Sequence, residues 1–389
     1  MSNNLIRKPI SRRAHALEAS LIREVAEVGM TMDDVVPLWF GEGAWPTSPQ
    51  IVEAAIASLQ AGRHNYQPNN GTVGLRDAIC SYSNNLYGCE LTRSQVTVTP
   101  SGMQGLMLAA EMLVTPEDRV VAIEPSWPNI IGAFKAMGAD VVTQNLRPVD
   151  GRWALDLDAL IDALTPDTTV FVVNSPNNPT GWTMSTQEQK TVLDHCRKHG
   201  IWIVSDDVYT RLYRHGTAAP SFLSIATAED RLLSVNSFSK CWSMTGWRLG
   251  WVVAPPELEA KFGQLTEFNT SCTTSFVQDA GIVALQKCEG EIAELNTKIR
   301  RGFEITSYHL KRFSRVNFIE PDGAFYCFFQ VDGLDNSYDA ALQIMREAKV
   351  GLAPGIAFGG PGEGYLRLCY AQPEEVLHQA FDQLSTYLS

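Results

Sequence analysis

The sequence predicts an α/β protein in which a large, mostly parallel seven-stranded sheet is covered by helices and joined to a smaller α+β domain. Between about residues 95 and 255, short apolar runs alternate with helical patterns. After about residue 285, a long polar helical pattern is followed by shorter strands. With 389 residues, the chain is long enough for one large core and a second, smaller one.

The expected strands of the large sheet are apolar runs rich in Val and Ile. They are often apolar on consecutive residues, as strands that are buried on both faces must be. Helix-like stretches such as 103–113 and 186–200 lie between them, and this alternation favours parallel pairing. The runs lie at 96–100, 120–125, 141–146, 169–176, 201–207, 232–238 and 249–255.

The two ends of the chain are expected to form the smaller domain. The pattern over 289–314 predicts one long polar helix, and 325–331 and 365–371 predict short strands. We expect the N-terminal segment to join them, because a segment ahead of the large domain needs a surface on which to pack. The predicted division is an N-terminal arm with part of the small domain at 1–46, a large domain at 47–288 and a C-terminal small domain at 289–389.

Charge and composition argue against several classes of protein. The formal net charge is −12, and an acidic surface repels phosphate backbones, so we expect no nucleic-acid partner. No stretch approaches the ~18 apolar residues that a membrane helix requires, and the N-terminus lacks the apolar core of a secretory signal. The eight cysteines show neither C-x-x-C spacing nor a cluster with histidine, which predicts free thiols, no metal site and a cytoplasmic protein.

Polar residues that follow the predicted strands are candidates for a site, because ligands of such sheets collect at the carboxyl ends of the strands. Ser101, Gly102 and Met103 follow the first run and open a helix, whose free N–H groups suit a phosphate-sized anion. The same residues also fit a simple helix cap. The segment 177–181, Asn-Asn-Pro-Thr-Gly, taken alone indicates a turn.

Two further strand ends carry ionisable side chains. Asp206 and Asp207 end a buried strand, where a carboxylate needs a cation or a hydrogen-bond donor. Lys240 ends another strand, in Ser-Phe-Ser-Lys, and Arg248 follows in Gly-Trp-Arg-Leu-Gly. A single lysine of this kind usually extends to the surface. Together, however, these segments place a lysine, an arginine, aspartate, tyrosine, asparagine and a glycine-opened helix at one edge of the sheet.

This ordered set of motifs resembles the class I and II aminotransferases of the aspartate aminotransferase superfamily, which are fold-type I enzymes of pyridoxal 5′-phosphate (PLP). Ser-Phe-Ser-Lys with Gly-Trp-Arg-Leu-Gly after it is the most specific element. The matching segments cover nearly the whole chain and lie at 38–49, 65–79, 99–104, 124–129, 174–181, 205–209, 237–240, 246–250, 322–329, 353–359 and 364–371.

The resemblance implies roles for the residues around the cofactor. Lys240 is expected to carry PLP as a Schiff base and, when neutral, to move a proton between the substrate Cα and the C4′ atom of the cofactor. Asp206, chosen over Asp207 because it stands three residues before Tyr209, is expected to keep the pyridine nitrogen protonated. Tyr209 and Asn178 are expected to hydrogen-bond the phenolic oxygen. The implied phosphate ligands are Arg248, Ser237 and the helix start at Ser101, Gly102 and Met103.

The resemblance also implies how the substrates and a second subunit bind. Arg367 is expected to pair bidentately with the α-carboxylate of the amino acid or 2-oxo acid, with the backbone of Gly41 beside it. Trp127, which could also be a core aromatic, is expected to stack on the cofactor ring and, with Asn178, to contact the substrate. Tyr66 is expected to reach the phosphate of the neighbouring active site, which implies a homodimer.

Two departures from the family pattern concern the substrate. Gly41–Trp45 reads Gly-Glu-Gly-Ala-Trp where the family often has Gly-Glu-Pro-Asp-Phe, which alters the substrate mouth and adds apolar surface. Met103 stands where one aspartate-using branch has a lysine that meets a distal carboxylate. The amino donor therefore stays open, with glutamate and 2-oxoglutarate as the usual partner pair of the family.

Three functions remain to be compared. Transamination is the function that the full cofactor set and Arg367 favour. Another PLP reaction, such as that of a β-lyase, racemase or decarboxylase, is the first alternative, because the fold does not determine which bond at Cα breaks. A non-catalytic regulator is the second, but such regulators carry an added DNA-binding domain, and only about 45 residues precede the large domain here.

Overall fold

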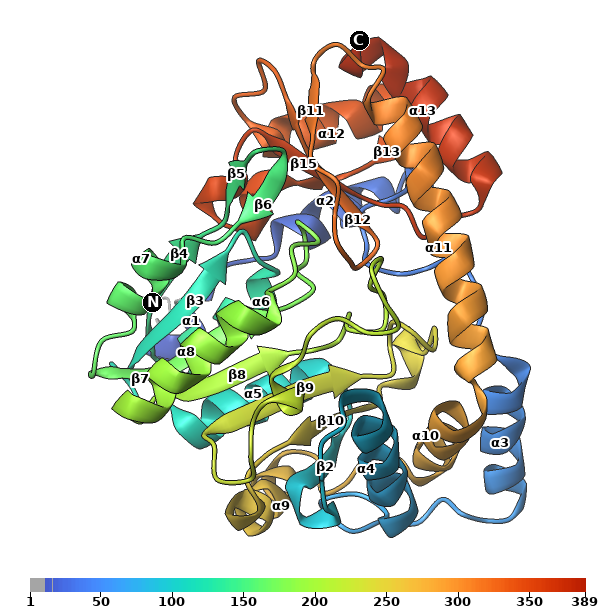
Figure 1. Cartoon of the computed structure of the whole chain (residues 1–389). Helices are drawn as coiled ribbons and strands as arrows, with labels where there is room; N and C mark the ends of the chain where they lie inside the picture. Colours follow the sequence, from blue (N-terminus) through green and yellow to red (C-terminus); the bar gives the residue numbers. More distant parts are fainter. Residues whose placement is uncertain (1–10, 16) are drawn as a thin grey trace, which may run out of the picture.

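The structure is a computed structural model that describes residues 11–15 and 17–389 (Figure 1). The first ten residues, on which the expected lack of a secretory signal partly depends, lie outside the described residues.

At the centre is a seven-stranded sheet, and each predicted apolar run forms one of its strands, which confirms the predicted fold class. In spatial order the strands are β2 (Val96–Thr99), β10 (Gly250–Val253), β9 (Leu232–Ser237), β8 (Trp202–Asp206), β7 (Thr168–Asn174), β3 (Arg119–Glu124) and β4 (Asp140–Asn145).

The pairing of these strands brings their polar ends to one edge of the sheet. All neighbours from β9 to β4 pair in parallel, and Asn174 at the end of β7 lies beside Asp206 at the end of β8. Strand β10 is antiparallel to both β9 and β2, so that its first residue, Gly250, pairs with Ser237 and Thr99 at this same edge. The segment that carries Arg248 therefore enters the sheet where the other strands end.

Both faces of the sheet are covered by helices, as the consecutive apolar residues require. Because side chains alternate across a strand, Val170 and Val172 of β7 pack into one cluster while Phe171 and Val173 pack into the other. The helices of the first cluster are α5 (Gly102–Leu113), α6 (Pro128–Met137) and α9 (Glu259–Asn269). Those of the second are α4 (Val73–Tyr87), α7 (Leu157–Ala163), α8 (Thr186–His199) and α10 (Ser275–Lys287), with α3 (Pro49–Gln60) packed on α10.

The smaller domain contains an antiparallel four-stranded sheet. The predicted long helix is α11 (Glu289–Leu310), which runs beside both domains in Figure 1, and it confirms the helical pattern read from the sequence. The two predicted strands also form. In spatial order the strands of this sheet are β11 (Val316–Phe318), β12 (Tyr326–Val331), β15 (Tyr365–Cys369) and β14 (Ala353–Pro354), and the remaining helices are α12 (Ser337–Ala348) and α13 (Glu374–Leu388).

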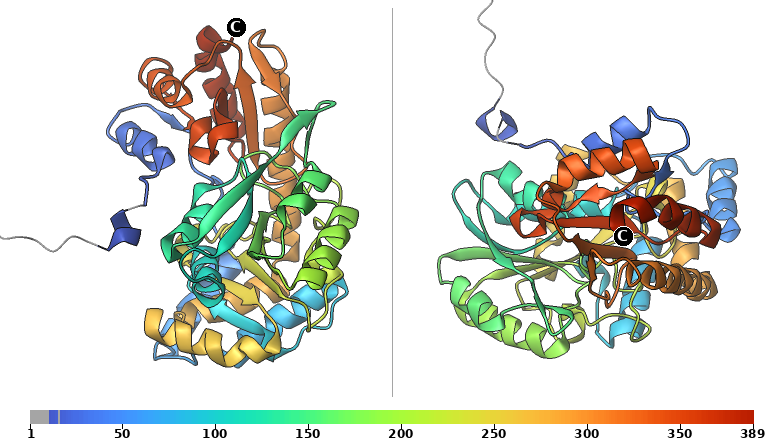
Figure 2. Two further views of the ribbon diagram at one scale, coloured as in Figure 1. Left: turned by 90° about the vertical axis from the view of Figure 1, so that its left-hand side faces the viewer. Right: turned by 90° about the horizontal axis from the view of Figure 1, so that it is seen from above.

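The N-terminal arm packs against the smaller domain. After α1 (Arg12–His15), helix α2 (Leu21–Gly29) contacts α12, and β1 (Val36–Pro37) pairs in parallel with β13 (Val350–Gly351) (Figure 2). The fit is close, because a Cβ atom at Gly351 would lie 1.8 Å from the Trp39 ring. This pairing holds the residues after β1, Phe40 and Gly41, beside the polar edge of the large sheet.

A hairpin that the sequence did not predict connects the two sheets. Strands β5 (Arg147–Val149) and β6 (Arg152–Ala154) pair with each other and extend toward the four-stranded sheet (Figures 1 and 2). The Trp153 ring packs there against Phe328 and Tyr365, with ring centroids 6.0 and 5.6 Å apart. The hairpin therefore adds apolar contacts that connect the two domains.

Two other expectations can be compared with the described residues. All eight cysteines are free thiols, as their spacing predicted. Within the described part of the chain, no helix has the length and apolar character that crossing a membrane would require.

Candidate active site

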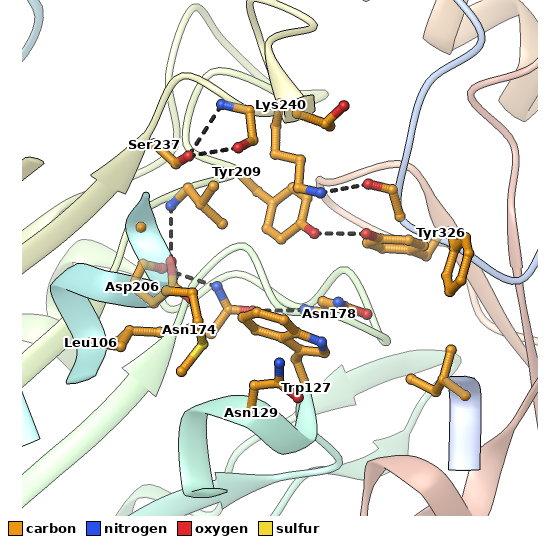
Figure 3. A pocket seen from close by; sticks show the side chains of 18 of the residues that line it. Leu106, Trp127, Asn129, Asn174, Asn178, Asp206, Tyr209, Ser237, Lys240 and Tyr326 are labelled. Atoms are coloured by element: carbon orange, nitrogen blue, oxygen red, sulfur yellow. Dashed lines mark hydrogen bonds between the residues drawn. The ribbon is translucent and has the colours of Figure 1, made fainter. Parts of the chain in front are cut away.

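A cavity of about 330 Å³ lies at the polar edge of the large sheet, and residues of the smaller domain and of the N-terminal arm also line it. Figure 3 shows side chains from several strand ends pointing into this space. All the predicted site residues except Ser101 and Tyr66 contribute to its wall. Those that line it are Gly41, Gly102, Met103, Trp127, Asn178, Asp206, Tyr209, Ser237, Lys240, Arg248 and Arg367.

One end of the cavity is the N-terminus of α5. Ser101 caps this helix, because its Oγ accepts a hydrogen bond from the Gln104 N–H (3.0 Å), while the Ser101 carbonyl accepts from Gly105. The N–H groups of Gly102 and Met103 precede the first intrahelical bond and are free for an anion. Ser101 thus acts on the site from behind the cavity wall, through the helix that it caps.

A serine and an arginine lie beside this helix start. Gly102 passes so close to β9 that an added Cβ would lie 3.1 Å from the Ser237 Cβ, and the Ser237 hydroxyl is buried at the same place. Arg248 has a left-handed backbone conformation (φ 55°) and donates to the Thr245 carbonyl (2.6 Å). Such a conformation is unfavourable for a non-glycine residue and is typical of functional sites. Helix start, hydroxyl and guanidinium together suit a phosphate group.

At the floor of the cavity lies Asp206, which has no cation in contact with it among the described residues. Its Oδ1 accepts from the Val208 N–H (3.2 Å), and burial raises its pKa to about 7. Asn174 donates from its amide to the Asp206 carbonyl (3.0 Å) and accepts from the Asn178 N–H (2.8 Å), which fixes the loop after β7 against the end of β8. A buried carboxylate in this position is complementary to a cationic N–H group.

Asp207 points to the other side of the strand, away from the cavity. Its carboxylate accepts hydrogen bonds from the hydroxyls of Ser205 (2.6 Å), Ser234 (2.7 Å) and Ser221 (2.9 Å). The side chain is buried, and this burial raises its pKa to about 6. Of the two neighbouring aspartates, Asp206 alone faces the cavity, because adjacent residues of a strand point to opposite faces.

Lys240 also lines the cavity. Its ammonium donates to the Gly41 carbonyl, and burial lowers its pKa to about 8. Nearby, the Tyr209 hydroxyl lies 2.6 Å from that of Tyr326, so the two phenols share a hydrogen bond (Figure 3). A lysine with such a pKa has a substantial neutral fraction near physiological pH, which a base or nucleophile requires.

Arg367 enters the cavity from the smaller domain. It lies on β15 and is almost fully buried. Its Nη1 donates to the Asn178 side chain (2.9 Å), and its other Nη donates to the Trp39 carbonyl. The Nε has no hydrogen-bond partner within the described residues. A buried guanidinium with unused donors is suited to a planar carboxylate.

These features fit PLP. The cavity volume is in the range of small-molecule sites. An anion-binding helix start, a buried carboxylate with a raised pKa and a lysine with a lowered pKa all line this one cavity. PLP carries a phosphate, a pyridine nitrogen and an aldehyde, and each of these has a complementary group here.

Several residues of this cavity were not singled out from the sequence. Asn174 and Tyr326 lie in segments that matched the family motifs, so those segments could have pointed to them. Phe40 also lies in such a segment, at 38–49, whereas Arg23 comes from the part of the N-terminal arm that matches no motif. Tyr66, by contrast, is 88% exposed and does not line the cavity of its own chain.

Comparison with known proteins agrees with this geometry. The family model described as aminotransferase class I and II matches residues 34–384. The aspartate aminotransferase of Pyrococcus horikoshii is 33% identical over 97% of each chain, and the probable N-acetyl-LL-diaminopimelate aminotransferase of Bacillus subtilis is 27% identical over 97% of this chain and 95% of its own. A single mutant of the Thermus thermophilus aspartate aminotransferase superposes with a TM-score of 0.92 at 28% identity, over 98% of this chain and all of the other. The chain therefore belongs to the class I and II aminotransferases, a fold-type I family of PLP-dependent enzymes.

Proposed function

We propose that the protein transfers the amino group of an L-amino acid to a 2-oxo acid, with PLP bonded to Lys240 and with 2-oxoglutarate and glutamate as one substrate pair. The observation that carries the proposal is that Lys240 lines one cavity together with the anion-binding start of α5 and the buried Asp206. When bound, PLP supplies the electron sink that stabilises negative charge at the substrate Cα.

The large domain supplies the groups that hold the cofactor. The N–H groups of Gly102 and Met103 bind the phosphate, together with the Ser237 hydroxyl and the Arg248 guanidinium. Asp206 would accept a hydrogen bond from the pyridine nitrogen and would keep that nitrogen protonated. Asn178 and Tyr209 would donate to the phenolic oxygen, and Trp127 would supply an aromatic contact.

The smaller domain and the N-terminal arm supply the groups that hold the substrate. Arg367 binds the α-carboxylate through two parallel N–H donors, and the backbone of Gly41 and the side chain of Asn178 lie beside it. Bound in this way, the substrate presents its Cα hydrogen to Lys240. The neutral form of the Lys240 amine, whose fraction burial increases by lowering the pKa, takes this proton on Nζ and returns it to the C4′ side.

We also propose that the working unit is a homodimer and that Tyr66 reaches the partner's phosphate site. The support is a pair of exposed aromatic side chains. Tyr66 and Phe268 are 88% and 90% exposed, and the Gln67 N–H donates to the Cys272 sulfur (3.3 Å), which ties the two segments together. Aromatic side chains are enriched at protein interfaces relative to the rest of the surface. Sedimentation equilibrium tests the proposal, and a monomer at micromolar concentration would contradict it.

The division of the chain near residues 46 and 288 is part of the same proposal. The described contacts support an N-terminal arm that packs on the C-terminal part, since β1 pairs with β13. Limited proteolysis that cuts near these positions and leaves large fragments would agree with it.

The experiment that tests the function is a half-reaction. The purified protein is mixed with PLP and with each member of a panel of amino acids, and the absorbance of the pyridoxamine form is followed. At least one amino acid should produce it, and 2-oxoglutarate should reverse the change. If none produces it, transamination is wrong. Release of pyruvate and ammonia from a cysteine conjugate without any 2-oxo acid would instead favour a β-lyase.

A further inference from the structure

The wall of the cavity carries one cation more than the cofactor and the α-carboxylate require. Four basic side chains line it, those of Arg23, Lys240, Arg248 and Arg367, against a single carboxylate, Asp206. On the proposed function, Lys240 bonds the cofactor, Arg248 binds its phosphate and Arg367 binds the α-carboxylate. Arg23 is left without a counter-charge, although the chain as a whole has a net charge of −12.

The geometry of Arg23 shows that it is not engaged elsewhere. It lies in the first turn of α2, and its side chain forms no ion pair or hydrogen bond with any described residue. Glu27 stands one helical turn further on, at the i+4 spacing that favours an ion pair, yet none forms. Instead, the guanidinium lies 5.6 Å from the centre of the Phe40 ring, which also lines the cavity.

Arg23 is close in the fold to the place where the α-carboxylate binds. Phe40, beneath its guanidinium, directly precedes Gly41, and Ile22 adds a second apolar side chain to the same wall. Helix α2 contacts α12 and β14, and β14 pairs with β15, which carries Arg367. Arg23 and Arg367 therefore approach the cavity on one packed unit, and a movement of that unit carries both.

From these observations we infer that Arg23 determines specificity by binding an acidic group at the far end of the substrate side chain, so that the preferred substrates are dicarboxylic. The inference rests on the proposed function. Phe40 and Ile22 contact the methylene groups of such a side chain, and Arg23 receives its carboxylate. The hydroxyl of Ser20, which lines the cavity one turn earlier, is a second donor for the same carboxylate.

The start of α2 adds to the positive potential of Arg23, because a helix N-terminus favours negative charge. Met103, in contrast, lies in the same wall and offers no charge. The acidic group is thus recognised from the N-terminal arm and the smaller domain rather than from the start of α5.

The test compares Arg23→Gln with wild-type holoenzyme on L-glutamate and on L-norvaline, in which a methyl replaces the distal carboxylate. Losing a charge-assisted, bidentate hydrogen bond should lower kcat/KM for glutamate by about 10- to 100-fold. The value for norvaline should change by less than about 2-fold. Arg23→Lys keeps the positive charge but loses the planar pair of donors, and its kcat/KM for glutamate should lie between those of wild type and of Arg23→Gln. Glu27→Gln, at an exposed position of the same helix but outside the cavity, is the matched control and should leave both values unchanged.

A binding measurement that needs no turnover gives the second readout. Calorimetric titration of the holoenzyme with glutarate and with pentanoate compares two unreactive acids that differ in one carboxylate. Arg23→Gln should raise the dissociation constant of glutarate by about 10-fold or more and leave that of pentanoate unchanged. Equal effects on both acids, or no effect on either, would overturn the inference, as would a wild type that prefers norvaline to glutamate. If no amino acid reacts at all, the proposed function fails, and the glutarate titration still decides the role of Arg23.

Discussion

The three serine hydroxyls that donate to the Asp207 carboxylate allow a quantitative prediction for the substitution Asp207→Asn. The buried carboxylate accepts three hydroxyl hydrogen bonds and has no cation among the described residues in contact with it, and burial raises its pKa from 3.8 to about 6. Because the pKa of the folded state is the higher one, folding favours the protonated acid. This contribution is fully present below about pH 4 and is lost as the pH rises through 6.

The size of the effect follows from the shift. About two pKa units correspond to ~3 kcal/mol of unfolding free energy between pH 4 and pH 7.5. Asparagine is neutral at every pH, so the variant does not lose this contribution. At about 2.1 cal/mol/K per residue, the unfolding entropy of 389 residues is about 0.8 kcal/mol/K, and the melting temperature of the variant should rise by ~4 °C relative to wild type over this range.

Calorimetry of the cofactor-free proteins at a series of pH values between 4.5 and 8 measures this difference. At the acid end the variant should be less stable by about 1 kcal/mol, because an amide satisfies three hydroxyls less well than a carboxyl group. A second effect at Asp206 acts in the same direction. Burial, and after it the Asp207 charge, raise the pKa of Asp206, so removing that charge lowers this pKa and reduces the stability that Asp206 loses as the pH rises. Asp335→Asn, at an exposed position, is the control and should show no trend. A difference between variant and wild type that stays constant or falls with pH would refute the reasoning.

Four further predictions concern the cavity. Lys240→Ala should abolish the absorbance near the visible edge that appears when PLP is added, and retained absorbance would show that another lysine binds it. Asp206→Asn should still bind PLP but slow exchange of the substrate α-proton by about 100-fold or more, measured by NMR in deuterated water. Arg248→Gln should raise the PLP dissociation constant by about 10- to 100-fold in a fluorescence titration. Gly41→Ala should lower the melting temperature, because its Cβ would lie 1.9 Å from the hydroxyl of a buried tyrosine, whereas Gly43→Ala, with its nearest atom at 3.7 Å, should not.

The strands of the large sheet could be predicted because burial on both faces leaves a distinct pattern of consecutive apolar residues. The direction of β10 could not, since an apolar strand has the same composition whichever way it runs. The β5–β6 hairpin was missed because β5 is exposed along its whole length and carries no periodicity. Strands β1, β13 and β14 have two residues each, and their pairing partners rather than their own sequences determine them.

The cofactor side of the site could be predicted because its residues follow strands in chain order. Tyr326 was assigned no role because it begins a strand of the smaller sheet, where a tyrosine resembles any core aromatic. Arg23 was missed for a different reason. On the polar face of an amphipathic helix, an arginine that faces a cavity has the same spacing as one that faces solvent. The role of Tyr66 stays a prediction because it concerns a second subunit. The domain boundaries stay predictions because they depend on long-range contacts rather than on the local sequence pattern.

The difference between these two sets of residues has a physical origin. The groups proposed to hold the cofactor lie at the ends of strands whose positions are set by the sheet, so a change in any of them disturbs the binding of PLP itself. The groups proposed to choose the substrate, Arg23 and Phe40, lie on an arm that packs on the smaller domain and touches the large sheet little. A substitution there changes the charge or shape at the far end of the substrate while Asp206 and Lys240 keep their surroundings. Specificity can therefore vary among proteins of this fold without loss of the common chemistry, and in this chain the N-terminal arm is a place where such variation leaves the groups of the large sheet unchanged.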